Sequence, residues 1–358
     1  MPSKDFHNKP FDEGTLTKLN IFELYTREWL PVFLSQENPP RHEIHIYDFF
    51  AGPGMDSKGI WGSPLRILRQ LKNCQVFKGW NRVSINIHFF DKSQKKIDQL
   101  NLNVDTHRPK AQNIRYDIRP MGFTDGLKIS EQDLANPNAA KLVFIDQTGV
   151  ANVTDEVFRT FVNSPSCDFL FFISSSTLHR FREHPAIRQK IVRPKDYYHI
   201  HRAALDYYRN LLPSNPRYFL APFSIKKGSN IYGVIFGSAH PRGMDKFLQV
   251  AWKSDEINGE ADFDINRANI IPGQLALFPD EIPPSKTAVF EAELESLIRN
   301  SSLTNELDVI QICFEHGMKR QHAEPVLKKL KREKVIDVNF RVPDISRHKS
   351  PRPIHMNK

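Results

Sequence analysis

The chain has 358 residues, a formal net charge of +9 and an isoelectric point near 9.3. This length allows one large α/β domain with a small second one, or two medium domains, and a hydrophobic fraction of 40% excludes a largely disordered protein. The excess of basic residues favours a polyanionic partner, of which nucleic acid is the simplest.

The cysteines and the N-terminus bear on the cellular compartment. Cys74, Cys167 and Cys313 lie far apart and form no CxxC pair, so they predict neither a zinc site nor a disulfide framework. The N-terminal residues lack the apolar run of a signal peptide, and no segment approaches the roughly 18 apolar residues of a membrane span. We therefore expect a soluble cytoplasmic protein with no membrane partner and no bound metal.

Apolar patterns predict a helix and five strands in the first half of the chain. An amphipathic helix is expected over 17–35, kinked or shortened by Pro31. The strands are expected at 43–50, 84–91, 113–117, 141–146 and 168–174. Because most of these runs are nearly all apolar, they are typical of parallel strands covered by helices on both faces, which predicts a doubly wound sheet.

Two further apolar runs, 217–225 and 230–238, are separated by too short a connection for a parallel crossover. They must form a hairpin, which gives a seven-stranded sheet with one antiparallel strand. This is the arrangement of class I methyltransferases, whereas a dinucleotide-binding Rossmann domain would continue with parallel units. With the helix expected at 244–252, the predicted fold class is α/β and the first domain spans 1–252.

The rest of the chain predicts a small second domain after a linker at 253–286, which is poor in periodicity. The expected elements are helices at 290–300, from the N-cap Thr304 to Gly317, and at 321–333, followed by a strand at 334–340. This order predicts a winged helix-turn-helix domain over 287–340. The tail 341–358 is basic and proline-containing, and we expect it to be disordered.

The stretch 47–65 joins an acid to a glycine-rich loop and a delayed helix. Asp48 ends the first strand, at the sheet edge where doubly wound folds bind ligands, and the glycines that follow would let the backbone approach a cofactor. The full GxGxxG pattern is absent, which argues against a dinucleotide. With the sheet predicted above, the cofactor is S-adenosylmethionine, and the expected contacts are Asp48, Phe50, Ala51, Gly52 and Gly54. A tight structural turn is the alternative.

The helix after this loop is expected to begin late, with Ser63 as N-cap and Pro64 at the first helical position. The residues between Gly54 and Pro64 then form an insertion that carries Trp61 like a lid.

Two acids at the ends of the next strands are further cofactor candidates. Asp91 ends the second strand, where an acid commonly accepts both hydroxyls of a cofactor ribose; the alternative is an N-cap for the following helix. Asp117 ends the third strand and is a candidate to receive an adenine amino group. With Arg115 and Arg119 beside it, a surface ion pair is the alternative.

Asp146 ends the fourth strand, where substrate meets the methyl donor in this architecture, and it is the catalytic candidate. Amino-methylating enzymes of nucleic acids carry Asp/Asn-Pro-Pro-aromatic here, whereas this chain has only the acid, followed by Gln147. The serines at 174–176 are a weaker candidate for substrate contact and are more often a helix start. The "HIH" at 199–201 has metal-compatible spacing only in a strand.

Basic residues cluster on and around the third helix of the predicted winged helix. A recognition helix would present such residues to phosphates; the alternative is a solvated face of a protein-docking domain. The candidates for nucleic-acid contact are Lys319, Arg320, Lys328, Lys329, Lys331 and Arg332.

The chain resembles the three-Cys-motif partner protein (TcmP) family. The resemblance rests on "DFFAGPG" followed by "GSPL", on "VFIDQTG" in place of Asp-Pro-aromatic-Gly, and on "SAHPRGMDKFLQVAW", and it extends over most of the chain. It implies a methyltransferase-like Rossmann domain, a winged helix, and a partner protein that bears three cysteines and is itself radical-SAM-like. The sequence departs from the family at Gln147, where proline is favoured.

The sequence therefore predicts an S-adenosylmethionine-dependent methyltransferase-like protein, of bacterial or phage origin, that acts on or near nucleic acid. A non-catalytic adaptor that binds the three-Cys partner or DNA is the main rival. A nicotinamide oxidoreductase is a third reading, which the hairpin and the missing third glycine disfavour.

Overall fold

The computed structural model describes residues 10–146, 153–173, 200–212, 218–228, 230–265, 284–347 and 349–357. The chain divides into two compact units, Met1–Ala239 and His240–Lys358, which are described separately. No helix among the described residues is both long enough and apolar enough to cross a membrane.

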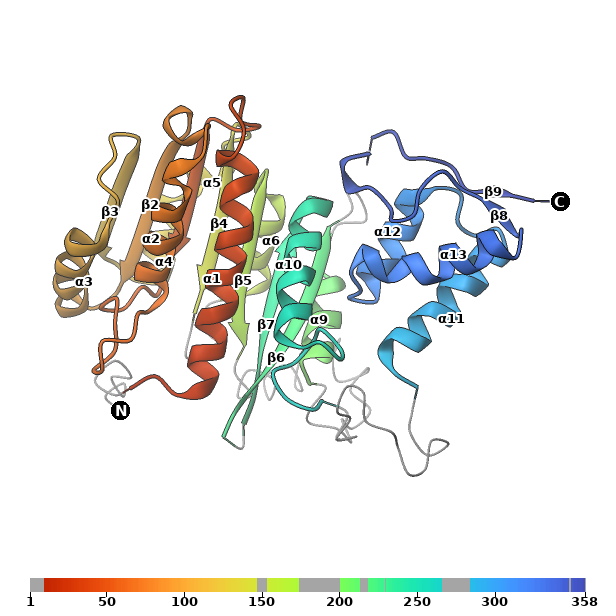
Figure 1. Ribbon diagram of the computed structural model, residues 1–358. Coiled ribbons are helices and arrows are strands. Elements are labelled where there is room, and N and C mark those ends of the chain that lie inside the picture. The colour runs from red at the N-terminus through yellow and green to blue at the C-terminus, as the bar shows by residue number, and fades with distance from the viewer. Residues whose placement is uncertain are drawn as a thin grey trace. The chain divides into compact units, whose positions relative to one another are not determined.

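A seven-stranded sheet forms the centre of the first unit (Figure 1). Its strands are β1 (Glu43–Asp48), β2 (Ser84–Asp91), β3 (Ile114–Pro120), β4 (Ala139–Ile145), β5 (Cys167–Ile173), β6 (Phe219–Lys227) and β7 (Asn230–Ser238). The spatial order is β3-β2-β1-β4-β5-β7-β6; β1 to β5 pair in parallel, and β7 runs antiparallel to both β5 and β6. The predicted seven-stranded sheet with one antiparallel strand is confirmed.

Helices cover both faces of this sheet (Figure 1). One face carries α1 (Glu13–Leu34), α2 (Ser63–Asn73) and α3 (Gln94–His107), and the other carries α4 (Phe123–Ile129), α5 (Glu131–Ala135), α6 (Asp155–Asn163) and α9 (Ile200–Arg209). The second face holds an aromatic core that includes Phe49, Phe158 and Phe169, none of them exposed. Burial of such rings supplies much of the driving force for folding.

Three element boundaries differ from the sequence prediction. Helix α1 continues through Pro31 to Leu34, because Leu30 and Leu34 are fully buried and hold the last turn in place. Helix α2 begins at Ser63 with Gly62 as its N-cap, one residue earlier than expected. Strand β3 extends to Pro120, so Asp117 lies inside the strand and does not end it.

The second unit consists of helices followed by a small sheet. Its elements are α10 (Pro241–Ser254), α11 (Lys286–Arg299), α12 (Glu306–Glu315), α13 (Glu324–Arg332), β8 (Ile336–Asp337) and β9 (His355–Met356). The N-cap of α12 is Asn305 rather than Thr304, because Asn305 and Asp308 form a capping box. Most of the predicted linker, residues 266–283, lies outside the described residues.

The basic tail 341–358 was expected to be disordered, and the described part of it is folded instead. Strand β9 pairs with β8, and the Ile354 side chain is buried. The guanidinium of Arg352 lies 2.7 Å from the Glu306 carboxylate, which is itself 1% exposed. A buried acid such as Glu306 needs a cationic partner, and the tail supplies it. The composition of the tail does not show this requirement, because it arises from a residue elsewhere in the chain.

Candidate functional site

The loop after β1 has a backbone that only glycine adopts readily. Gly52 and Gly54 have φ angles of 61° and 91°, in the left-handed region. The Gly62 N–H donates to the Gly54 carbonyl at 2.8 Å, and a Cβ on Gly54 would lie 3.0 Å from Leu100 in α3. The predicted glycine loop is therefore a closed turn that lies directly against α3.

The insertion within this loop is a rigid structure. Asp56 accepts hydrogen bonds from the backbone N–H groups of Lys58 and Ile60, and from Phe11 at 2.7 Å. Trp61, which we expected to act like a lid, packs against His107 with ring centres 4.8 Å apart and ring planes tilted by 59°, and it lies beneath the Arg69 guanidinium. The side chain is thus packed against residues of α2 and α3.

Asp91 connects the end of β2 to the glycine loop. Its Oδ2 accepts from the Gly52 N–H at 3.2 Å, and its Oδ1 accepts from the Ser93 N–H at 2.9 Å. The N-cap of α3 is Ser93, so the N-cap alternative does not describe Asp91. The carboxylate instead fixes the loop beside the sheet edge, and its remaining lone pairs are available to a ligand hydroxyl.

Asp48 is a fully buried acid at the end of β1. Its Oδ1 accepts from the Phe50 N–H at 3.0 Å, whereas Oδ2 has no hydrogen-bond partner among the described residues. Burial raises the pKa of Asp48 to about 7, against the opposing effects of the Ser63 hydroxyl and the Phe50 N–H and with a smaller contribution from the negative charges of Asp146 and Asp91. Three acids predicted from sequence therefore share one edge of the sheet.

Asp146 follows β4 and forms an ion pair that the sequence analysis missed. Lys18 in α1 places its Nζ 2.5 Å from Asp146 Oδ2 and 4.6 Å from the centre of the Phe172 ring. Lys18 is buried although charged, and Asp146 Oδ1 is buried with no partner among the described residues. Lys18 continues the buried helical stripe of Phe22 and Tyr25, which is the signal that could have identified it.

Asp117 takes part in an ion-pair cluster. It pairs with Arg119, and its Oδ2 lies 3.6 Å from Nδ1 of His88. Burial would raise the pKa of Asp117, but His88 and Arg119 outweigh it and hold that pKa below its usual value. The ion-pair alternative describes these contacts.

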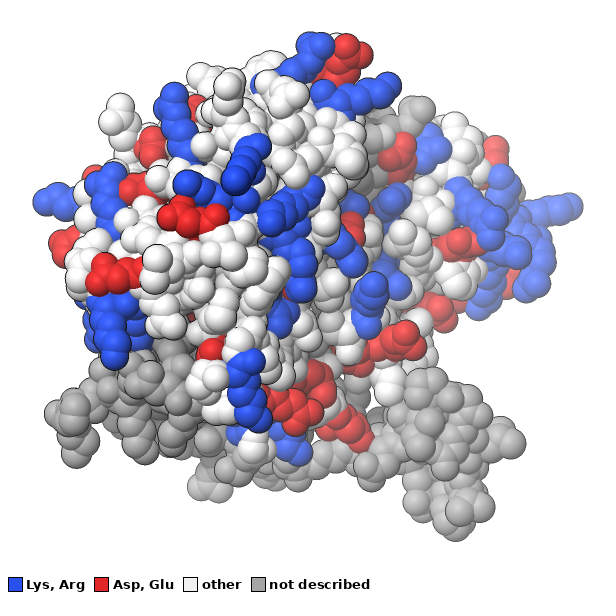
Figure 2. All heavy atoms as spheres, turned by 60° about the vertical axis from the view of Figure 1, so that its left-hand side comes forward, with Lys and Arg blue, Asp and Glu red and all other residues white. Residues whose placement is uncertain are grey.

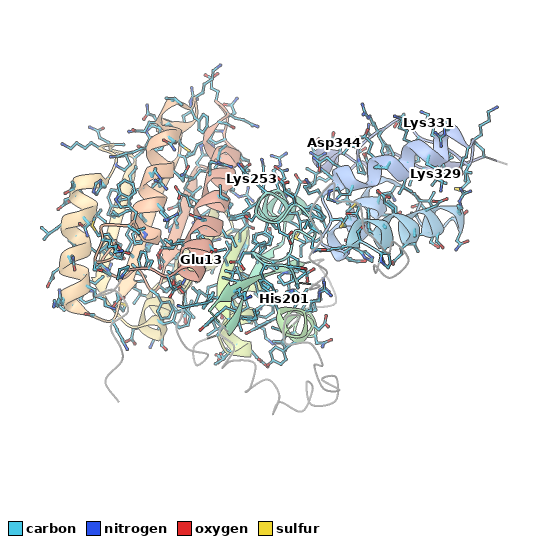
Figure 3. All side chains as sticks on the ribbon, turned by 60° about the horizontal axis from the view of Figure 1, so that its bottom comes forward. Glu13, His201, Lys253, Lys329, Lys331 and Asp344 are labelled. Atoms are coloured by element: carbon cyan, nitrogen blue, oxygen red, sulfur yellow. The ribbon has the colours of Figure 1, made fainter. Side chains whose placement is uncertain are left out.

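Several predicted basic residues of the second unit have partners within that unit. Arg320 donates to Asp245 at 3.1 Å, Lys329 lies 2.7 Å from Glu295, and Lys331 donates to the Val338 carbonyl at 2.8 Å. The exposed members on α13 are Lys328, Lys329, Lys331 and Arg332, and Figure 3 labels two of them. Lys319 lies over the Trp252 ring. Figure 2 shows Lys and Arg gathered at the right-hand end of the view, with few acids among them.

The remaining candidates contribute little. His201 lies in α9 and is buried, so the strand that "HIH" would need as a metal site is not formed there (Figure 3). Gln147 and the serines at 174–176 lie outside the described residues.

Comparison with known proteins adds likenesses of fold. No family model matches the chain, and no curated protein matches it. A SAM-dependent methyltransferase from Agrobacterium tumefaciens is 6% identical, with 63% of this chain and 62% of that chain covered and a TM-score of 0.35. The O-methyltransferase TomG from Streptomyces achromogenes, solved with SAM, is 9% identical, with 64% and 90% covered and a TM-score of 0.34.

A human methyltransferase 10 domain-containing protein is 9% identical, with 62% and 83% covered and a TM-score of 0.30. The class I methyltransferase-like fold of the first unit is assigned from the strand order and the single antiparallel strand.

Proposed function

We propose that the chain is an S-adenosylmethionine-dependent methyltransferase that acts on or near nucleic acid. The observation that carries the proposal is the acidic edge of the sheet, where Asp48 and Asp91 flank a loop whose glycines have left-handed φ angles. The unpartnered Oδ2 of Asp48 fits a ligand that brings a hydrogen-bond donor or a positive charge into a buried site.

The residues at this edge have distinct roles in the proposal. Gly52 and Gly54 would let the cofactor approach the backbone closely. Asp91 would accept hydrogen bonds from the ribose hydroxyls of the cofactor, and Asp48 Oδ2 would accept one from a donor group of the ligand. S-adenosylmethionine supplies an electrophilic methyl group when it is bound. Asp146 Oδ1 accepts hydrogen bonds from the attacking acceptor and stabilises the positive charge that develops on it.

The second unit recruits nucleic acid in this proposal. The order of α11, α12, α13 and the β8–β9 pair supports the proposed winged helix, and α13 carries exposed basic residues. Lys328 and Arg332 are the pair to test. Replacing both with glutamate should make the fall of log affinity for duplex nucleic acid with log salt shallower by about two units of slope, the contribution of two phosphate contacts. A slope that stays unchanged reassigns α13 to protein docking.

A non-catalytic adaptor, docking to a protein with a three-Cys motif, is the second candidate. The Lys18–Asp146 ion pair favours it, because Lys18 holds one oxygen of the acid that an acceptor would need. This candidate predicts that the chain binds the cofactor without transferring methyl groups and forms a stable complex with the three-Cys protein.

The experiment that separates the two follows labelled methyl groups from S-adenosylmethionine into total DNA and RNA. The enzyme proposal predicts labelled nucleic acid with wild type and a loss of roughly a hundredfold with Asp146→Asn. Asp98→Asn, an exposed acid on α3, is the matched control and should match wild type. Unlabelled nucleic acid from a protein that binds the cofactor would favour the adaptor, and full activity of Asp146→Asn would remove that residue from the mechanism.

A further inference from the structure

Two histidines and an acid meet on the face of the sheet that α4 and α5 cover. His45 is on β1, His88 on β2 and Asp133 on α5, and one potential ligand atom from each lies within 4.8 Å of the others. His45 Nδ1 is 3.0 Å from His88 Nε2 and 3.7 Å from Asp133 Oδ2. The Tyr47 hydroxyl is 3.4 Å from both His45 Nδ1 and Asp133 Oδ2.

The outer nitrogen of each imidazole faces a carboxylate. His45 Nε2 lies 3.2 Å from Glu43 Oε1, and His88 Nδ1 lies 3.6 Å from Asp117 Oδ2. A carboxylate near the outer nitrogen favours the tautomer that carries the proton there, with the lone pair of the inner nitrogen directed toward the centre of the cluster. This carboxylate–histidine arrangement is the one that orients imidazoles around a metal ion.

The two inner nitrogens lie 3.0 Å apart, so without an ion one of them donates its N–H to the other, and a metal ion would replace that proton and take both lone pairs. Asp133 also faces the same centre, a feature that a shared proton does not require.

We propose that His45, His88 and Asp133 bind a divalent transition-metal ion, with Zn²⁺ the best fit. Bonds of about 2.0–2.1 Å in a tetrahedral site place ligand atoms roughly 3.3 Å apart. The inner atoms lie 3.0 and 3.7 Å apart, so small side-chain rotations complete the site. The Tyr47 hydroxyl or a water fills the fourth position.

The site is structural and lies apart from the proposed cofactor edge. Successive residues of a strand point to opposite faces, so His45 and Tyr47 point away from the face of Asp48, and His88 points away from the face of Asp91. The Asp133 side chain is 44% exposed, which gives an ion a route from solvent, whereas His45 is 4% exposed. The ion would fasten α5 to β1 and β2. The inference does not depend on the proposed function.

The test uses full-length protein without a histidine tag, stripped with a chelator and titrated with Zn²⁺ or Co²⁺. We expect one equivalent to bind, with the visible absorption bands of tetrahedral Co²⁺ and a rise in the thermal midpoint. Asp133→Asn should weaken the affinity roughly tenfold or more, and a His45→Gln, His88→Gln double variant should abolish it.

His42→Gln is the matched control, because His42 is an exposed histidine just before β1. It should bind Zn²⁺ and Co²⁺ as wild type does. Wild-type binding no tighter than that of the double variant would overturn the proposal, as would an affinity that Asp133→Asn leaves unchanged. If the double variant fails to fold, the comparison of Asp133→Asn with His42→Gln decides alone.

Discussion

Replacing Asp48 with asparagine should stabilise the first unit at neutral and alkaline pH. Burial raises the pKa of Asp48 from 3.8 to about 7, so between these values the folded chain holds a proton that the unfolded chain has released. The free energy of unfolding then falls as pH rises from about 4 to 7 and is level above that. At about 1.4 kcal/mol per pKa unit, the loss is about 4 kcal/mol as an upper limit. Asparagine carries no charge and keeps the acceptor for Phe50 N–H.

The assay is urea unfolding of wild type, Asp48→Asn and the surface control Asp98→Asn at about pH 4.5 and about pH 8. Hydrogen exchange of β1 and β2 amides assigns the change to the first unit, because the two units need not unfold together. We expect the difference in free energy of unfolding between Asp48→Asn and wild type to grow by a few kcal/mol in favour of the variant from about pH 4.5 to about pH 8. A difference that does not change with pH would refute the reasoning.

Two further perturbations test contacts within each unit. Lys18→Met and Asp146→Asn should each destabilise the first unit in urea unfolding. Their double-mutant cycle should give a coupling free energy of about 1–3 kcal/mol. Additive effects would show that the ion pair does not stabilise the fold. Arg352→Ala should lower the free energy of unfolding by about 3 kcal/mol, because it leaves Glu306 buried without its cationic partner. The control Arg341→Ala removes a 78% exposed side chain from its ion pair with Glu324 and should lower that free energy by less than about 1 kcal/mol. Equal losses would contradict the account.

The architecture of the first unit could be read from local patterns. Apolar runs such as 142–145 indicate buried parallel strands, and the short connection near Gly228 requires a hairpin. Asp48 and Asp91 were found at strand ends because the carboxyl ends of parallel strands meet at one edge. These signals depend on neighbouring residues only.

The missed features join residues that are distant in the sequence. Lys18 and Asp146 are 128 positions apart, and no periodicity links them. His45, His88 and Asp133 come from three elements whose alignment is set by the register of β1 with β2. The prediction of no metal site rested on motif spacing, which detects ligands that share a loop or a helix, and it stays a prediction against the proposed ligands, which a sheet would assemble.

The most direct test of the central claim is calorimetry of the wild-type chain with S-adenosylmethionine and S-adenosylhomocysteine. We predict one site for each, lost in Gly52→Val because the valine side chain would intrude where the cofactor approaches the backbone, and weakened in Asp91→Ala by about 1.5–3 kcal/mol. Gly59→Ala is the matched control for backbone strain: it also places a side chain at a positive φ in this loop, but no atom lies within 4 Å of its Cβ position, and it should retain binding. Wild-type protein that shows neither heat nor a thermal shift with both compounds would contradict the account.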